Sequence, residues 1–358
     1  MFYSKLSLQN FRSYQDYVVE LSPSVNIIVG LNGSGKTNLL EALYVLGMGT
    51  SFRGSDKNLL RHGAGWFNLR GNYGDQHRAL TFQPGRMPAK QFSIDGTKRQ
   101  RLSHQQRTPI VLFEPDELRL PNGSPARRRD YLDGLLARLW PEASRVKSQF
   151  ERALLQRNSV LKQTGSYRKA SIDDELFVWN IKLAEYAERL MLYRLRFLAI
   201  ANSRIAEVYS QIAKRTSQVR LQYESELKVH DTNYKTHLLN ALNKQTARDL
   251  DRGFTTIGPH RDDITFVLNN TDAAVSASRG ELRSLVLALK ILELQLIGEQ
   301  TGHTPLLLLD DVFSELDSQR RESLASLASA YQTVITTTEA DVAKGYFLGH
   351  SGINAILL

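Results

Sequence analysis

Apolar runs and helix-like repeats alternate along this chain, and their order predicts a mixed α/β fold. Near the N-terminus, FYSKLSLQNF alternates between apolar and polar residues and SVNIIVG is mostly apolar, so both stretches are expected to be strands. A helix is predicted over about residues 36–47. Residues 65–113 hold several short apolar runs separated by Gly, Pro and Asp, a pattern typical of antiparallel sheet.

The pattern changes between residues 126 and 250, where Leu, Ala, Arg, Lys and Glu dominate. A helical stretch is predicted over 126–163, with Pro141 in the first turn of a new segment. A single long helix is predicted over 171–213. Because the apolar positions do not follow a regular heptad repeat, these helices are expected to form an arm or lobe rather than a coiled coil.

Strands and helices alternate again after residue 250, which favours a parallel sheet. FTTIGPHRDDITFVLNN predicts strand, followed by a helix over 278–299, the strand TPLLLLDD, a helix near 318–329 and the strands QTVITTT and NAILL. The predicted fold is an α/β head with a parallel core sheet and an antiparallel β-subdomain. Residues 1–125 and 251–358 are expected to build this head, with residues 126–250 inserted as a helical lobe.

One motif in the predicted head is typical of a nucleotide-binding site. GLNGSGKT, residues 30–37, fits the phosphate-binding pattern G-x-x-x-x-G-K-[ST], and it follows an apolar strand and precedes a predicted helix. Its glycines let backbone N–H groups turn toward phosphate oxygens, Lys36 is expected on the β- and γ-phosphates, and the Thr37 hydroxyl is expected on Mg²⁺. The expected ATP-binding residues are Gly30, Leu31, Asn32, Gly33, Ser34, Gly35, Lys36, Thr37 and Asn38.

Such a loop needs an acidic partner for Mg²⁺ at the end of a neighbouring strand. LLLLDD, residues 306–311, supplies one. Asp310 is predicted to hold the Mg²⁺ shell, and Asp311 to orient or deprotonate the water that attacks ATP. The two halves of this ATP site lie at opposite ends of the chain, so a single site would be assembled across the inserted lobe.

The stretch SASRGELRSLVLALK, residues 276–290, places Ser278, Gly280 and Glu281 at the start of a predicted helix. Together with the P-loop, the LLLLDD strand and the SELD after it, this order resembles the ABC-type ATPases of the SMC group. In that group the Ser-x-Gly helix start binds the γ-phosphate held by a second subunit, a contact for which Ser278 and the N–H groups at Gly280 are suited. A capping box between Ser278 and Glu281 explains the same residues, and both can hold at once.

Further blocks extend the resemblance along nearly the whole chain. LQNFRSY, GLNGSGKTNLLEALYVLGMGTSFR, SPARRRDYLD, GPHRDD and DDVFSELD are similar to the RecF family of bacterial recombination-mediator ATPases. The resemblance implies ATP-dependent homodimerisation, DNA binding at single-strand/double-strand junctions or gaps, and weak, DNA-stimulated ATP hydrolysis. It also implies work with RecO and RecR to load RecA in DNA repair, replication restart and the SOS response, in the cytoplasm.

Some family positions can be matched in this chain and others cannot. Arg12 in NFRSY resembles a basic residue that reaches the nucleotide from the first hairpin; a surface arginine is the other interpretation. FEPDELRL lies where a Q-loop is expected, but only Gln105 and Gln106 are candidate glutamines. Thr337 or Thr338 occupies the place of the switch histidine of ABC transporters, and GPHRDD predicts only a tight turn into a strand.

The net charge of the chain indicates which kind of partner it binds. The chain has 358 residues, with 46 Lys and Arg against 37 Asp and Glu, and its net charge of +9 suits nucleic acid. Two basic runs are either DNA contacts or solvated faces: TKRQR with the nearby Arg107, and ARRR, whose arginines are Arg127, Arg128 and Arg129. Because positive charge at a helix start opposes the helix dipole, ARRR also suggests contacts with phosphates or with carboxylates of the same chain.

Other function classes fit less well. The chain has no cysteine, which excludes disulfides and Cys-ligated metals, and it shows neither a signal peptide nor ~18 consecutive apolar residues, so no membrane association is expected. A nucleotide-binding subunit of an ABC transporter is the alternative, although such a subunit normally has a shorter insertion, a Q-loop and a switch histidine. An ATP-gated nuclease would need a second carboxylate cluster, and the Ser-x-Gly-Glu and SELD motifs argue against a plain P-loop kinase.

Overall fold

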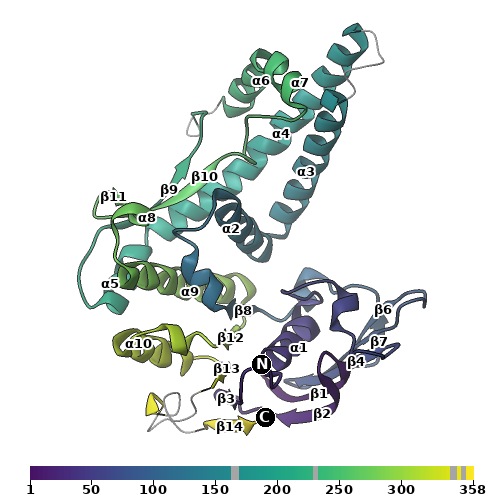
Figure 1. Cartoon of the computed structure of the whole chain (residues 1–358), viewed down its shortest axis with the longest axis vertical. Coiled ribbons are helices and arrows are strands. Elements are labelled where there is room, and N and C mark those ends of the chain that lie inside the picture. The colour runs from purple at the N-terminus through teal and green to yellow at the C-terminus, as the bar shows by residue number, and fades with distance from the viewer. Residues whose placement is uncertain (163–168, 229–232, 339–344, 348–351) are drawn as a thin grey trace. The chain divides into compact units, whose positions relative to one another are not determined.

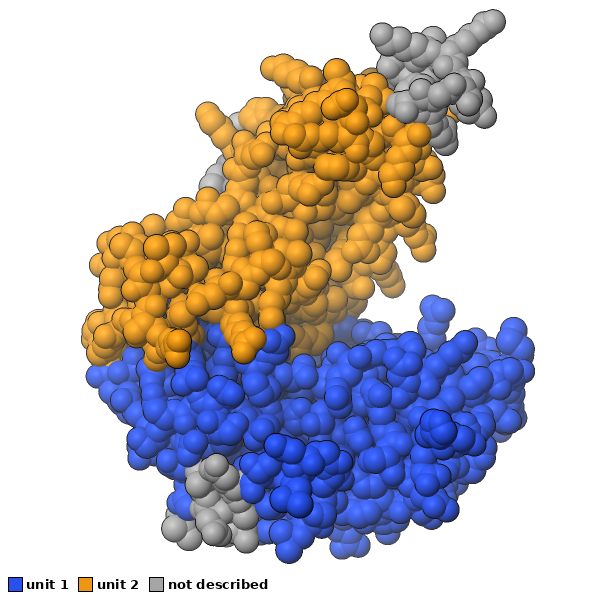
Figure 2. Space-filling view, in the orientation of Figure 1, with its two compact units in different colours: residues 1–118, 211–214, 283–358 blue, residues 119–210, 215–282 orange. Residues whose placement is uncertain are grey.

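The computed structural model describes residues 1–162, 169–228, 233–338, 345–347 and 352–358. The chain divides into two compact units, coloured separately in Figure 2. Unit 1 contains residues 1–118, 211–214 and 283–358, and unit 2 contains residues 119–210 and 215–282. Unit 2 is therefore an insertion into unit 1, and it includes residues 251–282, which the sequence pattern groups with the C-terminal part of the head.

Unit 1 is built around a parallel five-stranded sheet whose strands come from both ends of the chain (Figure 1). The strand order is β14 (Asn354–Leu357), β3 (Val25–Val29), β13 (Thr333–Thr337), β12 (Leu306–Asp310) and β8 (Ile110–Phe113). All residues of β8, β12 and β13 are buried, as expected for parallel strands that are covered on both faces. The sequence pattern groups β8 with the antiparallel strands, but its parallel register with β12 places it in the core sheet.

A second sheet of unit 1 has six strands and is antiparallel. Its order is β2 (Tyr14–Glu20), β1 (Tyr3–Phe11), β4 (Phe67–Tyr73), β5 (Gln76–Phe82), β6 (Lys90–Ile94) and β7 (Thr97–Arg99). Helix α1 (Lys36–Met48) joins the two sheets, because one hydrophobic cluster contains Leu43 of α1, Leu69 of β4 and Leu308 of β12. This shared core fixes the start of α1, where the P-loop ends.

Two longer helices and four short 3₁₀ turns complete the head among the described residues. They are η1 (Asp56–Leu59), η2 (His104–Gln106), η3 (Pro115–Arg119), α9 (Arg279–Thr301), η4 (Phe313–Glu315) and α10 (Ser318–Ala328). Of these, η3 and α9 cross the boundary between the units, at residues 118 and 282 respectively. The helices expected over 278–299 and 318–329 correspond to α9 and α10.

Unit 2 combines helices with a three-stranded antiparallel sheet. Its elements are α2 (Pro125–Leu139), α3 (Pro141–Lys162), α4 (Lys169–Asn202), most of α5 (Ile205–Ala213), β9 (Val219–Glu224), α6 (Tyr234–Lys244), α7 (Thr246–Arg252), β10 (Asp263–Leu268), β11 (Thr271–Asp272) and α8 (Ala273–Ser276). Helices α3 and α4 lie side by side (Figure 1), and residues of both share one hydrophobic cluster.

The expectation of a single helix over 171–213 is wrong, because α4 ends at Asn202 and α5 starts at Ile205. The side chain of Asn202 explains the break. Its Nδ2 donates to the carbonyl of Leu221 at 2.9 Å and its Oδ1 accepts from the Leu221 amide at 2.7 Å, so it pairs with strand β9. An asparagine that hydrogen-bonds backbone outside its helix favours a helix end over a helix interior.

Buried arginines cross-link unit 2, and the GPHRDD block belongs to this network. Arg194, which is 2% exposed, donates to both carboxylate oxygens of Asp133 and to the carbonyl of Pro259 in that block. Tyr223 donates to Asp262 at 2.8 Å. The block therefore supplies hydrogen-bond acceptors to buried and half-buried side chains of unit 2. The sequence pattern predicts only a tight turn for it.

His260 of the same block is held neutral by its surroundings. Its Nε2 lies 3.0 Å from the carbonyl of Thr255, and its Nδ1 is buried without a hydrogen-bond partner among the described residues. Burial lowers the pKa of His260 to about 4 from its ordinary value of 6.5. Protonation would place a second buried donor where none of the described residues accepts a hydrogen bond.

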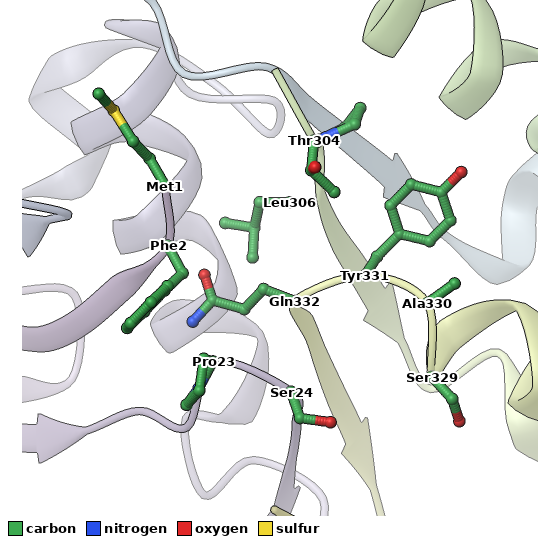
Figure 3. A pocket seen from close by; sticks show the side chains of 11 residues that line it. Met1, Phe2, Pro23, Ser24, Thr304, Leu306, Ser329, Ala330, Tyr331 and Gln332 are labelled. Atoms are coloured by element: carbon green, nitrogen blue, oxygen red, sulfur yellow. The ribbon is translucent and has the colours of Figure 1, made fainter.

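The amino edge of the core sheet is held by Gln332, which is 7% exposed. Its Nε2 donates to the carbonyls of Tyr3 (2.6 Å) and Ser22 (2.9 Å), and its Oε1 accepts from the Tyr3 amide (2.8 Å). Figure 3 shows Gln332 in the wall of a cavity of about 250 Å³ at the amino ends of β3, β12 and β13. Ligands of open parallel sheets bind at the opposite, carboxyl edge, so we assign Gln332 a structural role.

We expect Gln332→Ala to lower the free energy of unfolding by about 2–4 kcal/mol, because it removes three hydrogen bonds and leaves backbone groups of Tyr3 buried without partners. Urea unfolding followed by circular dichroism measures this. The matched control is Gln300→Ala at the exposed end of α9, for which a change within about 0.5 kcal/mol is expected. Equal effects of the two substitutions would contradict the assignment.

We expect acid to destabilise the protein between pH 6.5 and 4 in part through His260. In this window the unfolded chain binds a proton that the folded chain excludes, so stability is present at higher pH and is lost as the pH falls. The effect at the acid end is up to about 3 kcal/mol. Urea unfolding at several pH values should show a smaller pH slope for His260→Gln than for the natural chain, and no such difference for His303→Gln at an exposed position.

Candidate nucleotide-binding site

The P-loop lies between β3 and α1, where its motif predicts it. Gly33 and Gly35 have φ angles of 84° and 103°, in the left-handed region that favours glycine. Gly35 is the N-cap of α1, and the Lys36 side chain that follows is 7% exposed. Its Nζ donates to the carbonyls of Gly30 (2.7 Å) and Leu31 (2.9 Å). An ammonium group held in the loop at a helix N-terminus is the arrangement that binds phosphate groups.

The remaining loop residues differ in exposure. Leu31 and Asn32 are exposed, and Leu31 is 82% accessible. Asn38 donates to the Ser13 hydroxyl at 2.9 Å, which ties α1 to the turn between β1 and β2. The Ser34 hydroxyl is buried without a hydrogen-bond partner among the described residues, so it is suited to accept or donate a bond to a ligand.

Thr37 and Asp310, from opposite ends of the chain, meet at the carboxyl edge of the sheet. The Thr37 Oγ1 donates to Asp310 Oδ1 at 2.9 Å, and the Thr336 Oγ1 donates to the same oxygen at 2.7 Å. Asp310 is the last residue of β12 and is 9% exposed. The structure therefore brings together the hydroxyl and the carboxylate that the sequence assigns to Mg²⁺.

Asp311 follows in an unusual backbone conformation, with a φ of 52°. Its amide donates to the Thr336 hydroxyl at 2.9 Å, and the Ser314 hydroxyl donates to its carbonyl at 2.6 Å. Burial raises the pKa of the Asp311 carboxyl, while the Lys36 ammonium group acts in the opposite direction. Its Oδ1 is buried without a hydrogen-bond partner among the described residues, so this oxygen is able to accept a proton from a ligand or water.

Arg12 is part of an ion pair at the start of α1. Its Nε and Nη2 donate to the two carboxylate oxygens of Glu41 at 2.7 and 2.8 Å. Glu41 is 0% exposed and also accepts from the Ser51 hydroxyl at 2.5 Å. The side chain of Arg12 is 22% exposed, and its ion pair with Glu41 holds it at the start of α1, while its contact with a nucleotide stays a prediction.

Neither the Q-loop glutamine nor the switch residue has a simple counterpart. Gln106 closes a capping box with Ser103, and Gln105 is exposed. Thr337 is buried at the end of β13 and its carbonyl accepts from the Gly30 amide at 3.3 Å, whereas Thr338 is exposed. The threonine that contacts the carboxylate pair is the preceding one in the strand, at position 336.

Ser278 and Glu281 form the capping box expected from the sequence, within unit 2. The Ser278 amide donates to Glu281 Oε2 at 2.7 Å, and the Glu281 amide donates to Ser278 Oγ at 3.3 Å. These hydrogen bonds with Ser278, with help from Arg215, lower the pKa of Glu281 to about 2. Ser278 is exposed and Gly280 half-buried, so the capped helix start is accessible to a partner molecule.

The two basic runs have different environments. In ARRR, Arg128 pairs with Asp263 at 2.5 Å and Arg129 donates to the carbonyl of Asp262 at 2.7 Å. These contacts with the GPHRDD block account for two of the three arginines at this helix start. In the other run, every cation is exposed: Lys98, Arg99, Arg101 and Arg107.

Two residues of the site, Glu41 and Thr336, and the neighbouring Glu114 were not predicted. Glu41 left a signal, because it is a charged residue inside the apolar run LLEAL. Thr336 lies in a run of threonines that gives no hint of which one meets Asp310. Glu114 follows β8, and burial together with Glu117 and Asp310 raises the pKa of its carboxyl to about 7.

The described part of the chain contains neither of two further kinds of feature, clusters of metal-binding side chains and membrane-spanning helices. There, no three His, Asp or Glu side chains converge as they do in protein-only metal sites. Among the described helices, none combines the length and the hydrophobicity that crossing a membrane requires.

Known proteins resemble this chain over its full length. The family model "RecF/RecN/SMC N terminal domain" matches residues 2–66. The DNA replication and repair protein RecF of Staphylococcus carnosus is 33% identical over 366 aligned positions, which cover 98% of this chain and 97% of the relative. RecF of Acidothermus cellulolyticus is 36% identical over 95% of this chain and 94% of its own length.

A solved structure supports the same assignment. It is described as the recombination mediator protein RecF-ATPrS in the RecFOR pathway, and it superimposes with a TM-score of 0.86 at 29% identity, over 100% of this chain and 96% of that one. The similarity in fold confirms the predicted ATPase head with an inserted unit. Given relatives that are more than 30% identical along nearly the whole sequence, this chain belongs to the RecF family of DNA replication and repair proteins.

Proposed function

We propose that this chain is an ATP-dependent DNA-binding protein of recombinational repair, which dimerises on ATP and hydrolyses it slowly. The hydrogen bond between Thr37 and Asp310 carries the proposal, because it joins a P-loop to the acidic strand end that such a loop needs. The solved RecF structure that resembles this chain is described with ATPrS, which supports nucleotide binding at this loop.

The residues at this strand end fit Mg²⁺. Thr37 Oγ1 and Asp310 Oδ1 converge, and the buried Asp311 Oδ1 has no partner among the described residues. Hydroxyl and carboxylate oxygens suit this cation, which usually takes few protein ligands beside substrate phosphates and waters. When bound, Mg²⁺ would neutralise charge on the β- and γ-phosphates. Lys36 would hold the same phosphates from the P-loop.

Asp311 is the proposed base for hydrolysis. Its raised pKa favours proton uptake, and its unpartnered oxygen is suited to orient a water molecule. Asp is one methylene shorter than the Glu usual in ABC-type ATPases. We therefore expect turnover well below the roughly 10 s⁻¹ median of enzymes, as suits a switch.

The second half of each site would come from another copy of the chain. Ser278 lies exposed at a helix start, where backbone N–H groups and a hydroxyl suit a phosphate. In a head-to-tail dimer, the Ser278 helix of each copy would contact the γ-phosphate held by Lys36 of the other. The capping box with Glu281 would shape this helix end for the contact.

DNA repair with RecO and RecR, through loading of RecA at gaps, is the proposed role of the dimer. Full-length similarity to RecF proteins supports it and disfavours the transporter alternative. The similar solved structure is placed in the RecFOR pathway by its description.

The proposed DNA contact is the exposed basic run of unit 1. No acidic residue occurs between Asp95 and Glu114, whereas this interval contains four exposed cations: Lys98, Arg99, Arg101 and Arg107. Arg128, by contrast, is occupied by Asp263. Dimerisation would double the basic surface, so DNA binding should depend on ATP.

Mixing two inactive variants tests the composite site. Ser278→Arg should leave ATP binding by the monomer nearly unchanged but abolish ATP-induced dimerisation and hydrolysis, because a bulky cation would meet the opposing nucleotide. Lys36→Met should abolish or greatly weaken ATP binding. A mixed dimer contains one site with both an intact Lys36 and an intact Ser278, so we expect partial ATPase activity that neither variant shows alone.

The capping role alone predicts a different result. Ser278→Arg would then cost about 0.5–2 kcal/mol of helix stability, and mixing would restore nothing. Sedimentation of both variants establishes that they are folded and exchange subunits. Absence of recovery under those conditions would overturn the head-to-tail dimer, and unchanged ATP affinity of folded Lys36→Met would overturn the P-loop assignment.

Neutralising the exposed basic run tests the DNA surface. We expect Lys98→Ala, Arg99→Ala and Arg101→Ala together to weaken ATP-dependent binding to gapped DNA. They should also reduce the slope of log affinity against log salt by up to about 3, since each phosphate contact contributes roughly one unit. Fluorescence anisotropy at several salt concentrations measures both quantities.

The matched control removes three exposed arginines of unit 2: Arg145, Arg152 and Arg189. Unchanged binding in this control supports the unit 1 surface. If the control loses affinity and the first variant does not, the DNA contact lies on the helical unit.

A further inference from the structure

Glu114 is a carboxylate beside the nucleotide site to which the proposed mechanism gives no role. Strands β8 and β12 are parallel neighbours, and their register pairs Phe113 with Leu309. Glu114 and Asp310 are the next residues of the two strands, so they stand at matching positions on the carboxyl edge of the sheet. The charge of Asp310 acts on the Glu114 carboxyl, which agrees with this placement.

The backbone around Glu114 is fixed from two sides. The Glu114 amide donates to Glu117 Oε2 at 3.1 Å. The other carboxylate oxygen of Glu117 accepts from Lys290 Nζ at 2.6 Å, and the same ammonium donates to the carbonyl of Leu112 at 2.8 Å. Lys290 is 4% exposed on helix α9. Residues 112–117 are thus anchored to a buried cation, which holds Glu114 in place at the strand end.

The Glu114 side chain itself is unsatisfied. None of the described residues donates a hydrogen bond to its carboxylate, although the group is half-buried. Glu117 and Asp310 repel its negative charge, and Arg53 and Lys290 offset this repulsion in part. A partly buried carboxylate next to other carboxylates costs free energy unless a cation or a donor meets it. A further positive group near Asp310 would therefore be electrostatically favourable.

We propose that Glu114 is a further residue of the nucleotide site, whose carboxylate accepts a hydrogen bond from a water on the Mg²⁺ held by Thr37 and Asp310. The proposal rests on the proposed ATP-binding function. Mg²⁺ keeps several of its waters in proteins, and groups that hold such waters strengthen metal binding although they do not touch the ion. The segment FEPDELRL, which lacks a Q-loop glutamine, would then place a carboxylate next to a water bound to the metal.

This role has two consequences of opposite sign. With Mg²⁺ present, Glu114 strengthens binding of the Mg²⁺–nucleotide. Without Mg²⁺, the same carboxylate repels the phosphates, so it weakens binding of the bare nucleotide. A residue that only maintains the fold would change both affinities in the same direction.

Fluorescence titration of a labelled ATP analogue, in EDTA and over a range of Mg²⁺ concentrations, tests this on the full chain. We expect Glu114→Ala to raise the Mg²⁺ concentration for half-maximal binding by about tenfold, the lower end of the effect of groups behind metal ligands. In EDTA the same variant should bind the analogue more tightly than the natural chain. Glu114→Gln keeps an oxygen acceptor without the charge, so its shift in Mg²⁺ dependence should be smaller.

The matched control is Asp116→Ala, which removes an exposed carboxylate from the same short turn. Its Mg²⁺ dependence should equal that of the natural chain. A shift as large as that of Glu114→Ala would show a general charge effect and overturn the proposal, as would unchanged Mg²⁺ dependence of Glu114→Ala. If Glu114→Ala does not fold, Glu114→Gln carries the same test. Absence of any Mg²⁺-dependent binding by the natural chain would instead overturn the proposed function.

Discussion

The nucleotide site depends on the pairing of strands from opposite ends of the chain. Strand β3 lies between β13 and β14, and β12 lies between β13 and β8. Thr37 can reach Asp310 only when these strands are in register, because Asp310 ends β12 and the P-loop that leads to Thr37 follows β3. Closing such a long loop costs chain entropy before any contact is gained, so this pairing is expected to be a late and slow step in folding.

Local signals carried most of what the sequence predicts. The P-loop, the capping box at Ser278 and the strand that ends at Asp310 are each specified by residues that are adjacent in the chain. Contacts between distant residues were harder to foresee. The pairing of β9 with β10, and of Asn202 with Leu221, joins segments whose own patterns are ambiguous, so the long helix expected there is in fact interrupted.

In the nucleotide site, too, the residues of short motifs could be predicted, whereas residues that depend on distant partners could not. Lys36 and Thr37 follow from a motif, whereas the roles of Glu41 and Thr336 follow from partners elsewhere in the sequence. Sequence alone also treats the two basic runs alike. In the structure, Arg128 neutralises Asp263, while Lys98 and its neighbours face solvent. The difference between the ion-paired Arg128 and the solvent-exposed basic run was set by a carboxylate 135 positions away from Arg128.

The backbone of Asp311 constrains the chemistry that its side chain can perform. A φ of 52° is tolerated by Asn and Asp better than by longer side chains, because a short polar group can bond locally. A glutamate there would gain reach but would adopt this conformation at greater cost. The slow hydrolysis proposed for this protein would then be tied to a main-chain torsion, because a longer carboxylate would be better accommodated by a different turn after β12.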